Sequence, residues 1–350
     1  MTKVSNLFAA GTPFALYRRP GQQAFLVWQA TGEPLVRTEI PRGEDIEGFV
    51  FAPFAPCEDN PLLILGPGCL STVWELPLDI PPPLAGKHFA GASFSGEDFQ
   101  AYSRAFSRFS DALRHRALTK LVLSRARGFA RRADFSPEHV FAHACRRYPA
   151  AFVSLFFSPR TGMWLGASPE LLLGGEGGRW QTTAIAGTLP VETGKVAVWD
   201  AKNRREHRVV ADFIGERLAA LGIAPEMAAP LTCRAGNVAH IESNFYFSLP
   251  ARKSPWDVIA ALHPTPAVCG MPAEAAKRFI LANEGYDREY YSGFLGPVEK
   301  ETAVYVNLRC MKAEDGFLRL FSGSGIMPDS LLEQEWKETD HKMRTLFAVL

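Results

Sequence analysis

Four apolar segments follow one another between residues 151 and 190, separated only by short turns. "AFVSLFFS" and "MWLGAS" flank the turn "PRTG", and "PELLLGGEGGRWQTTAIAGTLP" holds two more segments around a glycine turn. Each segment has the length and the β-branched and aromatic content of a strand. Turns this short join antiparallel strands, because a parallel neighbour requires a crossover of a dozen or more residues. The middle of the chain is therefore predicted to be antiparallel sheet.

Helical patterns lie between groups of strands in the rest of the chain. Further strands are predicted in "QQAFLVWQA", "PLLILG" and "TKLVLSRAR", and a hairpin in residues 302–323 around Asp315-Gly316. Helices are predicted from a capping-box-like start at Ser95 and Asp98, in residues 136–148, 200–221, 254–262 and 272–284, and near the end of the chain. This grouping favours the α+β class. Residues 76–86, "LPLDIPPPLAG", are either a subdomain boundary or a rigid loop.

Composition excludes several classes of protein. The formal net charge is +1 over 350 residues, so no global field attracts nucleic acid or an anionic membrane. The six cysteines show no CxxC spacing, which indicates reduced thiols rather than a disulfide framework or a zinc site. No run of 18 apolar residues occurs. We expect a cytoplasmic protein with no nucleic-acid partner and no membrane partner.

The last predicted helix carries "EQEWKETDHK", in which Glu335, Glu338 and Lys342 share an arc of about 60°. The arc adjoins the apolar face of the helix rather than opposing it. One interpretation is a surface ion pair between Glu338 and Lys342 at i, i+4. The other is that all three charges face a functional site.

Three more charged residues stand in unusual surroundings. Lys120 lies inside the apolar strand "KLVLSR", where it either reaches water along its stem or is buried and able to act as a base. Glu170 in "GASPELLL" is either an exposed carboxylate at a strand start or an acid. Glu206 follows a basic cluster (Lys202, Arg204, Arg205, with Arg208 after it), which is interpreted as a solvated helix face rather than a nucleic-acid site.

Glycine turns after strands are a further signal. "IAGT" at 185–188 and "SGSG" at 322–325 can offer backbone amides to an anion, although such turns are also common without a ligand. "LHPTPAVCGMP" at 262–272 is a rigid loop around Thr265, with either a structural role or a contact to ligand.

Taken together, these stretches resemble the chorismate-utilising enzymes, which include isochorismate synthases, salicylate synthases and the large subunits of anthranilate and aminodeoxychorismate synthases. The matching pieces run in family order, and they are "KLVLSR", "GASPELLL", "AIAGT", "EHRVV", "NVAH", "LHPTPAVCGMP", "YDREYYSGFLGPV", "NLRC", "SGSGI" and "EQEWKETDHK". The resemblance implies one α+β domain over residues 1–350, built from two facing antiparallel β-sheets with outer helices. Residues 1–90 would be its variable part and residues 91–350 its catalytic part.

The resemblance also narrows the activity. Ala186 stands where some aminodeoxychorismate synthases carry a lysine nucleophile, and Lys120 stands where anthranilate synthases carry a glutamine and use ammonia. This implies a member that uses water, without a glutamine amidotransferase partner: an isochorismate synthase or, as the alternative, a salicylate synthase. A monomer is expected. Leu189 replaces an arginine found in many relatives, which puts in doubt a loop ion pair rather than the chemistry.

By resemblance, each site residue acquires a role toward chorismate. Lys120 would take a proton from the water that attacks C2, and Glu170 would protonate the departing C4 hydroxyl. Their pKa values would have to be shifted in opposite directions, that of the lysine downward and that of the glutamate upward. Mg²⁺ would be held by Glu206 and Glu338, with Glu335 helping through water. The substrate-binding residues implied are Gly187, Thr188, His240, Tyr291, Arg309, Gly323, Ser324, Gly325 and Lys342.

Overall fold

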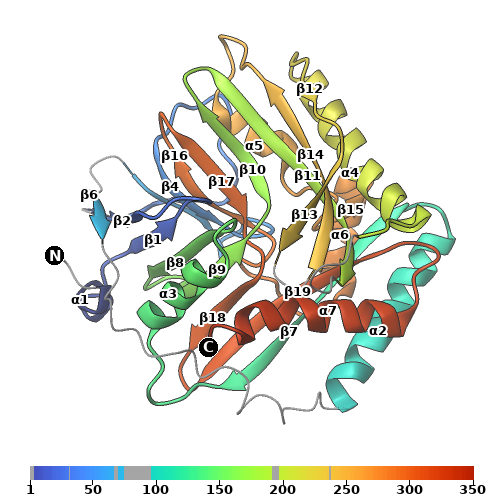
Figure 1. The fold of residues 1–350 in the computed structure, drawn as a ribbon, viewed down its shortest axis with the longest axis horizontal. Helices are drawn as coiled ribbons and strands as arrows, with labels where there is room; N and C mark the ends of the chain where they lie inside the picture. The colour runs from blue at the N-terminus through green and yellow to red at the C-terminus, as the bar shows by residue number, and fades with distance from the viewer. Residues whose placement is uncertain (1–3, 31, 67–69, 75–95, 191–196, 236–237) are drawn as a thin grey trace.

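Two antiparallel sheets face each other in the computed structural model, which describes residues 4–30, 32–66, 70–74, 96–190, 197–235 and 238–350 (Figure 1). Helices cover the outer faces of both sheets. The α+β class and the facing antiparallel sheets are therefore confirmed. The helix start at Ser95 and the linker-like stretch 76–86 lie outside the described residues.

The first sheet, here sheet A, carries the predicted lysine strand. Within the described residues it has nine strands in the order β15-β7-β19-β18-β9-β8-β1-β2-β6. They are β1 Phe14–Arg18, β2 Phe25–Gln29, β6 Leu70–Trp74, β7 Lys120–Ala130, β8 Phe152–Ser158, β9 Gly162–Ser168, β15 Gly270–Met271, β18 Cys310–Glu314 and β19 Phe317–Ile326. The expected pair around "PRTG" is the β8–β9 hairpin.

The second sheet, sheet B, has ten strands in the described part of the chain, in the order β12-β14-β11-β10-β17-β16-β4-β5-β3, with β13 paired to β14. They are β3 Leu35–Arg37, β4 Gly48–Ala52, β5 Leu62–Leu65, β10 Leu171–Glu176, β11 Arg179–Pro190, β12 Glu226–Met227, β13 Leu231–Ala235, β14 Val238–Phe247, β16 Phe294–Val298 and β17 Thr302–Val306. The β10–β11 hairpin is the one predicted around the glycine turn.

One predicted hairpin needs correction. Residues 302–323 were expected to form a single unit, and the turn at Asp315-Gly316 does join β18 to β19. The segment Thr302–Val306, however, is β17 and pairs with β10 and β16 in the other sheet. The chain changes sheet between Val306 and Cys310, and this connection carries Arg309 into the space between the sheets.

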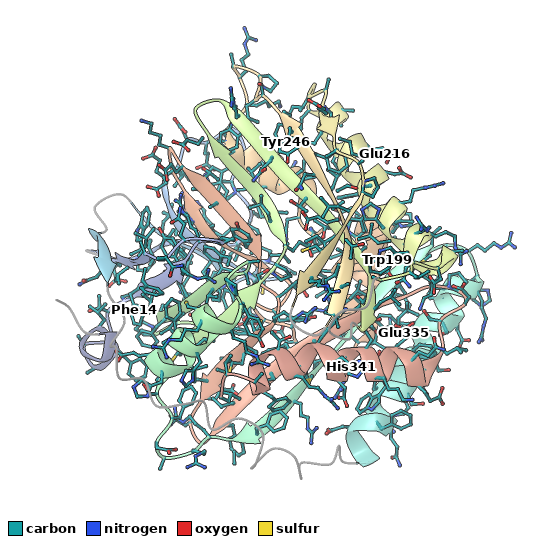
Figure 2. All side chains as sticks on the ribbon, viewed as in Figure 1. Phe14, Trp199, Glu216, Tyr246, Glu335 and His341 are labelled. Atoms are coloured by element: carbon teal, nitrogen blue, oxygen red, sulfur yellow. The ribbon has the colours of Figure 1, made fainter. Side chains whose placement is uncertain are left out.

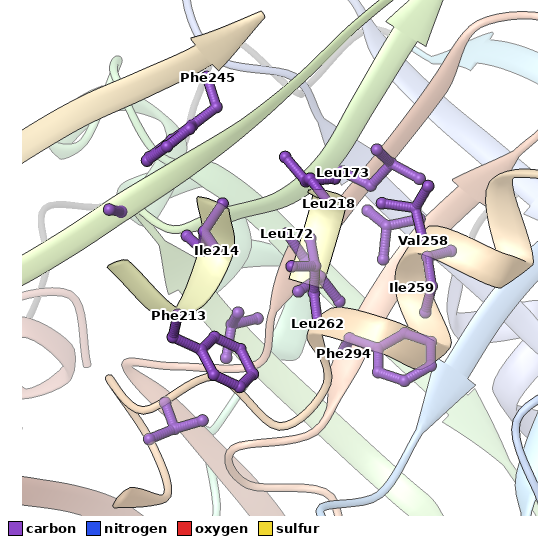
Figure 3. Close-up of a cluster of buried hydrophobic side chains, with 14 of the residues drawn as sticks. Leu172, Leu173, Phe213, Ile214, Leu218, Phe245, Val258, Ile259, Leu262 and Phe294 are labelled. Atoms are coloured by element: carbon purple, nitrogen blue, oxygen red, sulfur yellow. The ribbon is translucent and has the colours of Figure 1, made fainter. Parts of the chain in front are cut away.

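Seven helices are present among the described residues. They are α1 Val4–Ala9, α2 Gly96–Arg114, α3 Pro137–Arg147, α4 Ala201–Ala220, α5 Pro255–Leu262, α6 Ala273–Asn283 and α7 Leu332–Phe347. On the outer face of sheet B, Phe213 and Leu218 of α4 and Leu262 of α5 pack against Leu172 of β10 and Phe294 of β16 (Figure 3). Burial of this apolar face is what holds α4, and the charged residues of its first turn, in place.

Aromatic side chains fill the space between the sheets at the end nearer the N-terminus. The Phe51 ring stacks on Phe156 and Tyr290 at centroid distances of 4.2 and 4.4 Å, and Phe152 stacks on Tyr305 at 4.5 Å. This packing closes one end of the interior. The polar residues that remain between the sheets therefore gather at the other end, near α7.

The first part of the chain completes both sheets. β1 pairs with β8 in sheet A, and β4 pairs with β16 in sheet B. No helix in the described ranges is long and apolar enough to cross a membrane. Five cysteines, at positions 57, 145, 233, 269 and 310, are free thiols, while Cys69 lies outside the described residues.

Candidate active site

A narrow pocket of about 60 Å³ opens between the two sheets beside α7. Its lining includes ten of the predicted site residues: Glu170, Gly187, Thr188, Glu206, His240, Tyr291, Arg309, Gly323, Gly325 and Lys342. These residues come from both sheets, from α4 and α7, and from three connecting loops. Segments more than 150 residues apart in the sequence therefore meet at one place.

The "SGSG" segment forms the end of β19 rather than a turn. β19 pairs with β7 along its whole length, but with β18 only as far as Leu320, so beyond that point its second edge has no strand partner among the described residues. Both glycines leave room for site atoms. A Cβ atom on Gly323 would lie 3.0 Å from the Tyr291 hydroxyl, and one on Gly325 would collide with the Glu206 carboxylate.

Lys120 begins β7 and is completely buried. Its Nζ lies 3.0 Å from Oε1 of Glu206, at ion-pair distance, but the angles are not those of a hydrogen bond. Nζ therefore has no hydrogen-bond partner in the described part of the chain. The interpretation of Lys120 as a side chain that reaches water is wrong, because no part of it is exposed.

Glu206 projects from the first turns of α4 toward β19. Burial raises the pKa of its carboxyl, but Lys120, Lys342 and Lys202 outweigh that effect and hold the pKa below its ordinary value. The carboxylate is thus ionised in the resting protein and surrounded by cations. Glu206 does not belong to a solvated helix face, although Arg204, Arg205 and Arg208 on the same helix are exposed.

Glu170 precedes β10 and faces the same pocket from sheet B. It is 3% exposed, and burial raises the pKa of its carboxyl to about 7, although a hydrogen bond from Thr265 and the charges of Lys120 and Lys342 act in the opposite direction. The Thr265 hydroxyl donates to Oε1 at 3.2 Å. The interpretation of Glu170 as an exposed carboxylate is therefore wrong. A carboxyl with this pKa can hold or release a proton near neutral pH.

Arg309 occupies the crossing between the sheets with a backbone φ of 48°, a region that non-glycine residues rarely adopt. Its guanidinium donates to Oγ1 of Thr345 at 3.0 Å and to Nε2 of His240 at 3.1 Å. Nδ1 of His240 lies 3.0 Å from the carbonyl of Gly187 and donates to it. Burial, with the charges of Arg309 and Lys342, lowers the pKa of His240 to about 3, so the imidazole is neutral and orients Arg309.

Of the three charged residues on the final helix, Lys342 lines the pocket, while Glu335 and Glu338 lie next to it. Lys342 bonds Glu338 at 2.7 Å, which is the i, i+4 pair, and it also donates to the carbonyl of Gly323 at 2.8 Å. Glu335 is 1% exposed and accepts a hydrogen bond from Lys202 at 2.7 Å. Figure 2 shows Glu335 on α7, facing the start of α4 near Trp199.

Five predicted residues are placed differently from expectation. The amide of Thr188 already donates to Oδ1 of Asn203 at 2.9 Å, so it is not free for an anion. The hydroxyl of Ser324 turns away from the pocket and bonds the hydroxyl of Tyr102 at 3.1 Å. Lys120, Glu335 and Glu338 lie next to the pocket rather than on its surface.

The carboxylates near α7 fit a hard cation only in part. All donors are oxygen atoms, as Mg²⁺ prefers, and Mg²⁺ commonly uses one or two carboxylates together with waters and substrate. Each of the three glutamates is instead paired with a lysine. Among the residues that the structure describes, no three His, Cys, Asp or Glu side chains are grouped closely enough to hold a metal ion.

Comparison with known proteins decides the family. The family described as chorismate binding enzyme matches residues 87–350. The chain belongs to this family. In amino-acid sequence it is 32% identical over 274 residues to isochorismate synthase DhbC of Bacillus subtilis, a match that covers 73% of this chain and 68% of that protein.

Shorter matches connect this chorismate binding enzyme to two proteins of Escherichia coli. It is 32% identical over 202 residues to isochorismate synthase EntC, covering 54% of this chain and 51% of EntC. It is 33% identical over 199 residues to isochorismate synthase MenF, covering 53% and 45%. The matched regions thus span about half the length of these two relatives.

Solved structures show the same fold over nearly the whole chain. The 2,3-dihydroxybenzoate-specific isochorismate synthase DhbC of Bacillus anthracis superposes with a TM-score of 0.81 at 22% identity, covering 97% of this chain and 96% of that one. The menaquinone-specific isochorismate synthase MenF of Escherichia coli superposes with a TM-score of 0.78 at 24% identity, covering 97% and 88%. At these identities the likeness establishes the fold.

Three residues of this chorismate binding enzyme escaped the sequence analysis as parts of the site. Thr265 was placed in a rigid loop with either a structural role or a contact to ligand, whereas its hydroxyl donates a hydrogen bond to Glu170. Nothing in the sequence pointed to Asn203. Its hydrogen bond to Thr188 joins the end of a strand to the start of a helix, and no local pattern predicts such a contact. Lys202 was taken for a solvated residue. It stands four residues before Glu206, so helical spacing alone places the two on one face of α4.

Proposed function

We propose that this protein is an isochorismate synthase that requires Mg²⁺. It would convert chorismate to isochorismate by addition of water at C2 and loss of the hydroxyl at C4. One water enters and one leaves, so substrate and product are isomers. Its relatives EntC, DhbC and MenF are named isochorismate synthases.

The observation that carries the proposal is the placement of Lys120 and Glu170. Lys120 begins β7 of sheet A and Glu170 precedes β10 of sheet B, so the two groups approach the pocket from opposite sheets. Addition at one ring carbon and departure from another require a base and an acid on different sides of the substrate. The pKa of Glu170, raised to about 7 by burial, suits the acid.

In the proposed reaction, Lys120 acts as the neutral amine: its ammonium first gives up a proton to solvent, and Nζ then accepts a proton from the attacking water. Nζ is buried beside the pocket and has no hydrogen-bond partner among the described residues, so it can bond a water molecule that enters with the substrate. Glu170 donates its proton to the oxygen at C4, and Thr265 keeps the carboxyl oriented through Oε1. In the reverse direction, the same two groups exchange roles.

The carboxylates of chorismate need cationic partners. Arg309, held by His240 and Thr345, presents a planar fork that suits a carboxylate, and Tyr291 also lines the pocket. A second cavity, of about 520 Å³, meets the first at Pro169 and Arg309. We propose that the substrate side-chain carboxylate binds at this junction.

Mg²⁺ would be held by Glu206 and Glu338, with Glu335 acting through water. Bound there, it would supply a Lewis acid beside the ring carboxylate of the substrate. The all-oxygen donor set supports this assignment. The carboxylates would have to exchange their lysine partners for the ion.

A product assay tests the activity. Purified protein with chorismate and Mg²⁺ is expected to yield isochorismate at equilibrium with chorismate. Accumulation of salicylate and pyruvate would instead show a salicylate synthase, and no consumption of chorismate would refute both.

The metal assignment has its own test. Glu206→Gln and Glu338→Gln should each raise the Mg²⁺ concentration that gives half-maximal activity, because an amide is a poorer ligand than a carboxylate for a hard dication. Glu216→Gln, on the same helix as Glu206 but outside the pocket, is the control. An unchanged Mg²⁺ requirement in both pocket variants would contradict the assignment.

A further inference from the structure

Lys202 connects two helices at the edge of the pocket. It stands in the first turn of α4, and its Nζ donates to Oε1 of Glu335 on α7 at 2.7 Å. The two side chains differ in exposure, with 25% of Lys202 and 2% of Glu335 open to solvent. Lys202 thus places a positive charge against a carboxylate that is otherwise buried.

The same lysine faces the other carboxylates of the pocket. One helical turn separates it from Glu206, and both Glu206 and Glu338 lie within electrostatic range of its ammonium. Lys120 and Lys342 pair with Glu206 and Glu338 at 3.0 and 2.7 Å, so three lysines match three glutamates. Lys202 differs from the other two because it has neither the catalytic role assigned to Lys120 nor the substrate-binding role assigned to Lys342.

We propose that Lys202 is a resident counterion, which holds Glu335 in the metal-free protein and competes with the divalent cation for the carboxylates. This inference rests on the proposed magnesium site. A cation bound by Glu206 and Glu338 would lie near the charge of Lys202, because both carboxylates are within electrostatic range of that ammonium. Lys202 therefore weakens metal binding in the absence of substrate, and the ammonium moves away from Glu335 when the metal binds.

The size of the effect follows from Coulomb's law. Lys202 is partly open to solvent, and with the dielectric constant of bulk water the repulsion between a unit charge and a dication about 6 Å apart is sufficient to change a dissociation constant by about tenfold. Removing the charge of Lys202 should thus tighten binding of the metal by this order. If Lys202 instead served only to orient Glu335 as a ligand, its removal would weaken binding.

The experiment measures binding of Mn²⁺, a substitute for Mg²⁺, by titration calorimetry and by the electron paramagnetic resonance of free Mn²⁺, without chorismate. The variants are Lys202→Met and Lys202→Gln, which remove the charge, and Lys202→Arg, which keeps it. Arg205→Met is the matched control. Arg205 lies on the same helix three residues away, and its ion pair is with the exposed Asp329 at 2.7 Å.

We expect the Mn²⁺ dissociation constant to fall about tenfold in Lys202→Met and Lys202→Gln, and to stay near the wild-type value in Lys202→Arg and Arg205→Met. Circular dichroism confirms that each variant is folded. If the wild type binds Mn²⁺ and both neutral variants bind it equally or more weakly, the counterion proposal is wrong and the proposed metal site stands. Absence of Mn²⁺ binding by the wild type and all variants, with and without chorismate, would overturn the metal site and the counterion together.

Discussion

The Glu206 carboxylate occupies the space that a Cβ atom on Gly325 would need. This contact lets a side chain from α4 reach across β19 to the Lys120 ammonium. The glycine is therefore required by its neighbour and not by its own backbone angles. "SGSG" thus marks the point where two glycines make room for site atoms from other elements.

Gly325→Ala should displace the Glu206 carboxylate from Lys120 while leaving the sheet intact. We expect turnover to fall about 100-fold, because misplacement of a site group by about 1 Å can cost this much. Steady-state kinetics provide the measurement. Gly128→Ala is the control. Gly128 lies in the neighbouring strand β7, and a Cβ atom there would meet no atom within 4 Å. Equal activity in the two variants would contradict the role given to Gly325.

Lys120→Met tests the proposed base. Methionine keeps most of the buried stem and removes the amine, so the fold should survive and turnover should fall at least about 100-fold. The rate is measured at saturating chorismate and Mg²⁺, on protein whose circular dichroism matches the wild type. Near-normal turnover would mean that another group activates the water.

Glu170→Gln keeps the size of the side chain but cannot deliver a proton. Chorismate should still bind, because Arg309 and the metal hold its carboxylates in the proposed complex. Single-turnover conversion should fall at least about 100-fold in both directions, since the acid of one direction is the base of the other. If binding were lost while the chemical rate was preserved, Glu170 would be a substrate contact instead.

The pH dependence of kcat/KM should report the Glu170 carboxyl. The proposed acid is active when protonated, so kcat/KM should fall as pH rises through about 7. The Thr265 hydrogen bond lowers the pKa of Glu170, so Thr265→Val should raise that pKa and move the fall in kcat/KM to higher pH. The pH profiles of the two proteins are compared directly. A shift to lower pH would show that Thr265 does not act on this carboxyl.

Arg288 connects the loop that carries Thr265 to strand β7, which carries Lys120. Its guanidinium bonds Glu284 at 2.6 Å and donates to the carbonyls of Val268 and Val122, which lie in the loop of Thr265 and in β7. Arg288→Met would leave Glu284 buried without its partner, at a cost of about 3–5 kcal/mol in unfolding free energy. Urea unfolding measures this loss.

The exposed pair of Arg205 and Asp329 provides the control for this measurement, because its loss should cost at most about 1 kcal/mol. Equal destabilisation by Arg288→Met and Arg205→Met would contradict a structural role for the buried pair.

The sequence was sufficient to predict the features that depend on local patterns and on the order of the motifs. The β8–β9, β10–β11 and β18–β19 hairpins follow from short turns between apolar segments, and the pairing of Glu338 with Lys342 follows from helical spacing. Glu170 was a candidate from its own sequence context, and its role, like the choice of Arg309, came from resemblance to the family. Neither their burial nor the pKa of Glu170 could be derived from spacing, because both depend on the packing of one sheet against the other.

Hydrogen bonds between side chains far apart in the sequence could not be predicted, because no local pattern indicates them. Asn203 reaches Thr188, and His240 reaches Arg309, across gaps of 15 and 69 residues. β17 looked like the first part of a hairpin because its apolar residues run on toward β18. The positive φ of Arg309 breaks that continuity, and a backbone angle of this kind has no signature in an arginine.

The longer of the two partner strands of β7 is β19, which lies about 190 residues further along the chain. A ribosome that adds about 5–20 residues per second needs roughly 10–40 s to synthesise that interval. During this time Lys120 is already outside the ribosome, on an apolar strand with an open edge, and neither Gly325 nor α7 yet exists. Nascent chains of this protein should therefore depend on chaperones, and catalytic competence should arise in a single step after the last helix emerges.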